Sequence, residues 1–167
     1  FAFFICITAF SQVKLPKLIS DGMVLQRDAD VKIWGWANKN EKVSVRFHDS
    51  IYLATANDSG KWEVKLSNLK AGGPYLMIIN ASNTINIKDI LIGDVWICSG
   101  QSNMELPMKR VSPVYESEIS NSDNPYIRYF TVPQAYNFKE PQIDLESGSW
   151  QSANPMDVLN FSAVSYF

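Results

Sequence analysis

Short segments of alternating polar and apolar residues fill the first half of the chain. Residues 31–36 (VKIWGW) and 42–47 (KVSVRF) point every second side chain to one face, which is the period of a half-buried antiparallel strand. Turn-forming Asn, Asp, Gly and Pro residues separate these segments from their neighbours. Further strands are expected at residues 51–56, 61–66, 75–80 and 84–90. This pattern predicts an all-β sandwich over residues 12–89.

The pattern changes at residue 90. Residues 90–98 (ILIGDVWIC) are almost continuously apolar, and residues 95–98 are expected to form a strand that is buried on both faces of a parallel sheet. A helix is expected to begin just after it, with Ser102 or Asn103 as its N-cap and Glu105 in its first turn.

Two more elements are expected further along the chain. A strand is predicted at residues 126–132, and residues 158–167 are predicted to open a helix with Asn160 as its cap. Residues 90–167 therefore predict the N-terminal part of an α/β domain, which is incomplete because such domains typically need about 100 residues or more. The whole chain is expected to have an α+β multidomain architecture.

The first residues are of a different kind. Residues 1–10 (FAFFICITAF) are apolar apart from one Thr, and the run is too short for a membrane span, which needs about 20 apolar residues. Together with Ala9-Phe10-Ser11 as a cleavage site, it predicts that residues 1–11 are the remnant of a signal peptide. The alternative is a buried strand that begins the fold. We expect a secreted or periplasmic protein whose sequence is truncated at its front.

Charge and composition exclude several classes of partner. The chain has 15 basic and 17 acidic residues without a run of Lys or Arg, so neither nucleic acid nor an anionic membrane is an expected partner. No His/Cys cluster indicates zinc, no loop resembles an EF-hand, and no Gly-rich loop would hold phosphate. We therefore expect no metal and no cofactor, and the sequence leaves the oligomeric state open.

The candidate chemistry centres on Ser102. A Gly-x-Ser turn between a buried strand and a helix would lift the serine hydroxyl clear of the sheet edge and direct backbone N–H groups at a developing oxyanion. Here Gly100-Gln101-Ser102 provides such a turn, but the second Gly of the nucleophile elbow is absent. The alternative is that Ser102 merely caps the helix.

Residues 93–108 (GDVWICSGQSNMELPM) closely resemble the sialate O-acetylesterase family of SGNH-type hydrolases. The resemblance implies that Ser102 is the nucleophile and that its backbone N–H is one donor of the oxyanion hole. It extends to residues 21–27 (DGMVLQR), 31–36, 124–130 and 150–167, and so covers nearly the whole mature chain. It also implies that residues 90–167 begin an SGNH-type esterase domain.

The catalytic partners of this family are missing from the chain. The family also uses a Gly, an Asn and an Asp-x-x-His segment, and nothing after Ser102 matches any of them. His48 is the single histidine, and its place before Asp49-Ser50 predicts a turn or surface residue. We therefore expect an N-terminal fragment that is inactive by itself, since loss of triad members is severe in serine hydrolases.

The resemblance implies hydrolysis of O-acetyl esters of sialic acids by a serine acyl-enzyme mechanism. An acetylxylan-type esterase is an alternative, because the sequence does not choose between acetylated sugars. A non-catalytic carbohydrate-binding module is the competing class, supported by Trp34, Trp36 and Trp62. Cys98, the one cysteine after the signal sequence, is expected to be a buried, inert thiol.

Overall fold

The structure is a computed structural model that describes residues 12–167, so the expected signal sequence at residues 1–11 lies outside the described residues. Within residues 12–167, no helix is both long and apolar enough to cross a membrane. Strands predominate, and helices are few and short.

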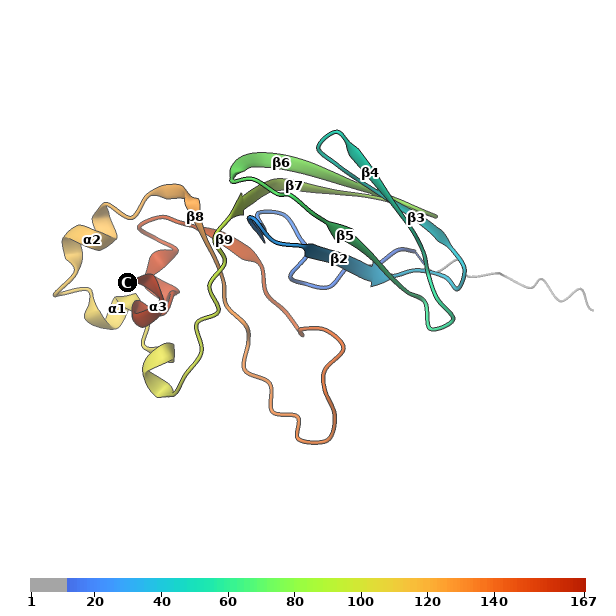
Figure 1. Ribbon diagram of the computed structural model, residues 1–167. Helices are drawn as coiled ribbons and strands as arrows, with labels where there is room; N and C mark the ends of the chain where they lie inside the picture. The colour runs from blue at the N-terminus through green and yellow to red at the C-terminus, as the bar shows by residue number, and fades with distance from the viewer. Residues whose placement is uncertain (1–11) are drawn as a thin grey trace, which may run out of the picture.

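Seven strands build the first part of the chain (Figure 1). The larger sheet has five strands in the order β1-β7-β6-β3-β4, and the smaller sheet pairs β2 with β5. Neighbouring strands are antiparallel, except that β1 runs parallel to β7. The bounds are β1 Val24–Gln26, β2 Val31–Trp36, β3 Lys42–Phe47, β4 Ser50–Thr55, β5 Lys61–Leu66, β6 Gly72–Asn80 and β7 Thr84–Gly93.

The two sheets enclose one hydrophobic core. Alternate residues of β2 and β5, such as Ile33 and Leu66, face alternate residues of the larger sheet, such as Val45, Met77 and Ile79, and all of them are buried. Burial of these side chains is the main stabilising term of the sandwich. The apolar residues that predicted these strands therefore point into the core, and the residues between them point toward solvent.

Three of the predicted strands have the predicted bounds, because β2, β3 and β5 alternate cleanly. β7 runs three residues further than expected, to Gly93. The extension exists because Leu91, Ile92 and Gly93 pair with β1, a three-residue strand that was not predicted.

Residues 94–167 form short helical turns and one hairpin. Their elements are η1 Ser102–Glu105, α1 Met108–Val111, α2 Glu116–Ser120, β8 Asn124–Phe130, β9 Trp150–Ala153, η2 Val158–Asn160 and α3 Ala163–Tyr166. A small cluster of buried residues, Met108, Ile119, Val158 and Ala163, packs them together. Figure 1 shows β8 and β9 between the sandwich and the short helices.

The buried strand predicted at residues 95–98 is wrong for this structure. These residues form no strand, and the exposed fractions of Trp96 and Ile97 are 84% and 94%. A strand that is buried on both faces needs neighbours for its backbone hydrogen bonds. No strand within residues 12–167 lies against this segment.

The two later predictions are partly wrong. The strand expected at residues 126–132 forms as β8, but it starts and ends two residues earlier and pairs antiparallel with β9. The helix expected at residues 158–167 is divided into η2 and α3, and Ser162 rather than Asn160 caps the second piece. The division occurs at Phe161, whose extended backbone directs its carbonyl oxygen at the amide of Met108.

Candidate functional site: the Ser102 loop

Ser102 is the first residue of the 3-10 helix η1 and is exposed to solvent. The N-cap is Gln101, in extended conformation, and no side chain caps this helix. The Ser102 hydroxyl makes no hydrogen bond to any residue of the described chain. The interpretation of Ser102 as a helix cap is therefore wrong, and the prediction that a helix begins beside it with Glu105 in its first turn is confirmed.

The chain that leaves the Ser102 loop is fixed by α3. The amide of Met108 donates to the carbonyl oxygen of Phe161 at 2.9 Å, and the amide of Ala163 donates to the carbonyl oxygen of Leu106 at 2.8 Å. These bonds flank an antiparallel bridge between Pro107 and Ser162. Two segments that are some 55 residues apart in sequence are thus held side by side, directly after the candidate nucleophile.

The chain that enters the loop is fixed by the end of β1. Arg27 donates from Nε to Asp94 Oδ1 at 2.9 Å, and the amide of Val95 donates to Gln26 Oε1 at 2.8 Å. The hydrogen bond from Arg27 holds the pKa of the Asp94 carboxyl below its ordinary value. Residues 21–27 are part of the resemblance, and in the structure two of them, Gln26 and Arg27, hold the connector to the Ser102 loop.

Within residues 12–167, no histidine or carboxylate is hydrogen-bonded to the Ser102 hydroxyl. His48 lies in the turn between β3 and β4, as predicted, with a positive φ of 52°. Its ring packs on Tyr75, with 4.0 Å between the ring centroids, and on Phe47. Within residues 12–167 there is also no group of three or more His, Cys, Asp or Glu residues that is placed to hold a metal ion.

Other candidate residues are placed differently from expectation. Cys98 is exposed, so the prediction of a buried thiol is wrong. Of the three tryptophans considered for sugar stacking, Trp62 is buried in the sandwich core. Trp34 and Trp36 are half-buried, and their rings pack edge to face with centroids 5.1 Å apart.

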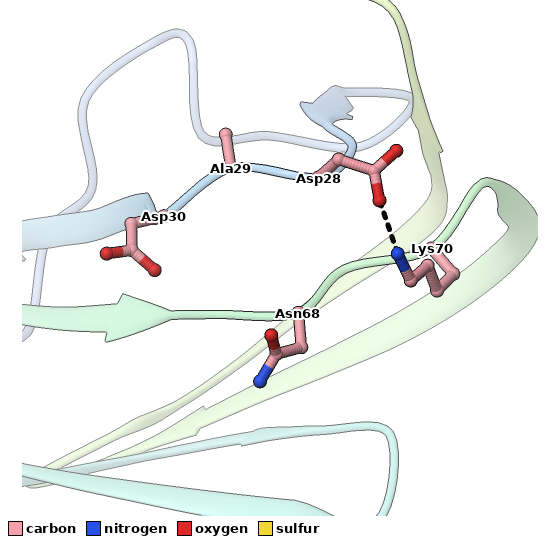
Figure 2. A pocket seen from close by; sticks show the side chains of 5 residues that line it. All are labelled: Asp28, Ala29, Asp30, Asn68 and Lys70. Atoms are coloured by element: carbon pink, nitrogen blue, oxygen red, sulfur yellow. Dashed lines mark hydrogen bonds and ion pairs between the residues drawn. The ribbon is translucent and has the colours of Figure 1, made fainter.

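A polar hollow lies on the sandwich, away from the Ser102 loop in sequence (Figure 2). Asp28, Ala29 and Asp30 line one side and Asn68 and Lys70 the other. Lys70 forms an ion pair with Asp28, and Lys65 forms one with Asp30. The hydrogen bond from Lys70 lowers the pKa of Asp28 below its ordinary value. Both carboxylates are therefore already paired with cations, and the hollow offers no unpaired acid for catalysis.

No family model matches the chain. Among curated relatives, it is 28% identical to mouse sialate O-acetylesterase (Mus musculus) over 91% of the chain and 31% of that protein. It is 32% identical to the human sialate O-acetylesterase (Homo sapiens) over 59% of the chain and 21% of that protein. Among solved structures, a carbohydrate acetylesterase from Xanthomonas citri superposes with a TM-score of 0.88 at 35% identity.

That superposition covers 93% of this chain and 35% of the bacterial enzyme, so the chain spans about a third of the length of the relatives that it matches. The sequence resemblance and the shared fold agree with each other, and the matched region includes nearly all described residues. The chain therefore belongs to a sialate O-acetylesterase-like family.

Proposed function

We propose that this chain is the N-terminal part of a secreted carbohydrate esterase that removes O-acetyl groups from sialic acids, with Ser102 as its nucleophile. The observation that carries the proposal is the place of Ser102 in residues 93–108, the segment that resembles the sialate O-acetylesterase family, where it lies exposed at the start of η1. Its hydroxyl is not used as a helix cap and is accessible from solvent.

The reaction would proceed through an acyl-enzyme. The Ser102 oxygen attacks the acetyl carbonyl carbon, a base takes the hydroxyl proton, and the sugar hydroxyl leaves with a proton. Water then adds to the acetyl-serine and releases acetate and free Ser102. The backbone N–H of Ser102 is our candidate for one donor to the oxyanion, because the first N–H groups of a helix have no partner within it.

The base is expected to be a histidine in the part of the relatives' length that this chain does not span, since His48 sits in the sandwich. Names of the curated relatives favour sialic acid esters as the substrate class, and the bacterial neighbour is named only for carbohydrate acetyl esters. Acetylated xylan therefore stays the alternative substrate. Secretion is part of the proposal and rests on the apolar residues 1–10.

The test is acetate release by the full-length protein carrying Ser102→Ala. We expect kcat to fall at least about a thousandfold, as it does when serine nucleophiles are removed from other hydrolases. Ser99→Ala in the same exposed loop is the matched control and should keep close to wild-type activity. Acetate release at the wild-type rate by the Ser102 variant would refute the nucleophile assignment.

Parallel assays with O-acetylated sialic acid and acetylated xylan, matched in acetyl content, identify the substrate class. A kcat/KM for the sialic acid ester at least tenfold above that for xylan is the expected outcome. The reverse order would replace the sialate assignment by the xylan one and leave the role of Ser102 intact.

A further inference from the structure

One charged pair joins the sandwich to the segment that carries Ser102. Arg128 of β8 contacts Asp89 of β7, with Nη2 at 2.9 Å from Oδ2 and 3.0 Å from Oδ1. The arginine side chain is only 10% exposed, and its Nε is buried and has no hydrogen-bond partner among the described residues. The Asp89 side chain is 47% exposed, so removal of Asp89 would leave a largely buried guanidinium whose remaining compensation is contact with solvent at the edge of the joint, which is unfavourable.

The surroundings of this pair show a close fit between the two parts. Gly22, with a φ of +78°, lies so near that an added Cβ would be 3.3 Å from Trp150 Cβ and 3.9 Å from Arg128 Nη1. The Trp150 indole N–H donates to the carbonyl oxygen of Leu18 at 2.9 Å, and its ring packs against the sandwich core. The amide of Lys17 donates to Asp144 Oδ1 at 3.1 Å.

Besides these contacts, the connector at Gly93–Val95 links the sandwich to residues 99–167. A single connector, even one held by Arg27 and Gln26, leaves rotation about its axis free, whereas a second attachment removes that freedom. β8 and β9 share one hairpin, and the segment after β9 leads to α3, which holds the exit of the Ser102 loop. The second attachment therefore acts on the same body that carries Ser102.

We propose that Arg128 is a positioning residue that locks the sandwich and the Ser102-bearing segment into one rigid body through Asp89. The lock itself is independent of the proposed esterase activity. Its consequence for catalysis rests on that proposed function, because a fixed sandwich keeps a constant orientation toward any substrate site built around Ser102.

The test follows the Trp150 indole N–H, whose hydrogen bond to Leu18 crosses the joint. Hydrogen exchange of the indole protons is measured on the full-length protein labelled with ¹⁵N-tryptophan, with Trp150→Phe used for assignment. In Arg128→Ala we expect exchange at Trp150 to accelerate roughly tenfold or more, since hydrogen bonds to charged groups are the stronger ones. Exchange at Trp62, in the sandwich core, should stay unchanged.

Three further variants separate charge from size. Asp89 has a positive φ of 57°, a conformation that Asn also adopts readily, so Asp89→Asn removes the charge without adding backbone strain and should accelerate Trp150 exchange. Arg128→Lys keeps the charge but loses the planar fork and should restore part of the protection. Arg110→Ala on the exposed face of α1 is the control and should leave exchange unchanged.

Unchanged exchange at Trp150 in Arg128→Ala would overturn the proposal. Equal acceleration at Trp150 and Trp62 would overturn it as well, because the pair would then stabilise the whole fold rather than this joint. Esterase kinetics on the same variants give the catalytic consequence, which we expect as a lower kcat/KM that Arg128→Lys partly restores. If Ser102→Ala shows that the proposed function is wrong, the exchange results still decide whether the lock exists.

Discussion

At the scale of single residues, the most informative polar side chains are those that form a hydrogen bond or ion pair and those that form none. The Ser102 hydroxyl makes no hydrogen bond within the described chain, whereas Asp94, on the connector that enters its loop, is paired with Arg27. Tyr129 of β8 is also engaged, since its hydroxyl donates to the carbonyl oxygen of Asp157 at 2.8 Å and its ring packs on Phe161. Polar groups with partners fix the structure, and the free hydroxyl is available for chemistry.

Tyr129 predicts a dependence of stability on alkaline pH. Burial, and then the charge of Asp157, raise the pKa of its phenol above the ordinary value of about 10. A raised folded-state pKa means that the stabilisation is fully present below the unfolded-state value and is lost as pH rises through the folded-state value. We expect unfolding monitored by circular dichroism to become easier above about pH 10 in the wild type.

The matched variants isolate this effect. Tyr129→Phe should flatten the alkaline loss, although it also removes one hydrogen bond at neutral pH. Tyr136→Phe, at a residue that is 80% exposed, should leave the alkaline profile unchanged. An identical profile in the wild type and Tyr129→Phe would show that the buried phenol is not the titrating group.

At the scale of elements, the part of the chain after Gly93 depends on a very small core. Met108, Val158 and Ala163 come from α1, η2 and α3, none of which exceeds four residues in length. Helices that short have little stability of their own, so packing has to hold them in place. The position of the Ser102 loop therefore depends on these few contacts.

Met108 is the residue at which this dependence is best tested. It is fully buried, and Met108→Ala is expected to destabilise this part by about 2–5 kcal/mol, the usual range for Met→Ala in a core. Denaturant unfolding, with hydrogen exchange at the amides of Met108 and Ala163, measures the loss. Met156→Ala, at a 78% exposed side chain, should change stability by less than about 0.5 kcal/mol. Equal effects of the two substitutions would contradict the role of the small core.

The elements that sequence reasoning found are those specified by local alternation. β2, β3 and β5 follow the period-2 pattern, and each predicted boundary matches the structure. The short strands β1 and β9 were not predicted, because each is defined by a partner strand that is distant in sequence. An apolar run such as residues 95–98 predicts burial, yet burial also requires a partner, which no residue in 12–167 supplies.

The candidate site also divides into residues that a local motif predicts and residues whose partners are distant in sequence. Ser102 was found from a local motif, and the structure places it exposed at a helix start. The residues that hold its loop and its orientation were not found. Arg128 and Asp89, for example, are 39 residues apart, and neither carries a local signal that pairs them.

At the scale of the whole molecule, the sandwich and the segment after it differ in how much apolar surface they bury. The sandwich core contains most of the buried hydrophobic residues, whereas large apolar side chains are exposed at Trp96, Ile97, Tyr136 and Phe138, by 84%, 94%, 80% and 94%. Soluble monomers rarely leave large contiguous apolar patches uncovered. The adjacent pair Trp96 and Ile97, just before the Ser102 loop, is the sharpest case.

This imbalance predicts the solution behaviour of the 167-residue chain. We expect it to bind a hydrophobic dye and to self-associate in sedimentation velocity experiments, because association removes exposed apolar surface from water. Trp96→Ser combined with Ile97→Ser should reduce both dye binding and association, with little change in unfolding, since neither side chain is part of a core. Lys39→Ser combined with Asp58→Ser, at an exposed ion pair of the sandwich, is the control. A monodisperse wild-type chain without dye binding would mean that residues 96 and 97 are covered in solution, and the double serine variant would then lower stability instead.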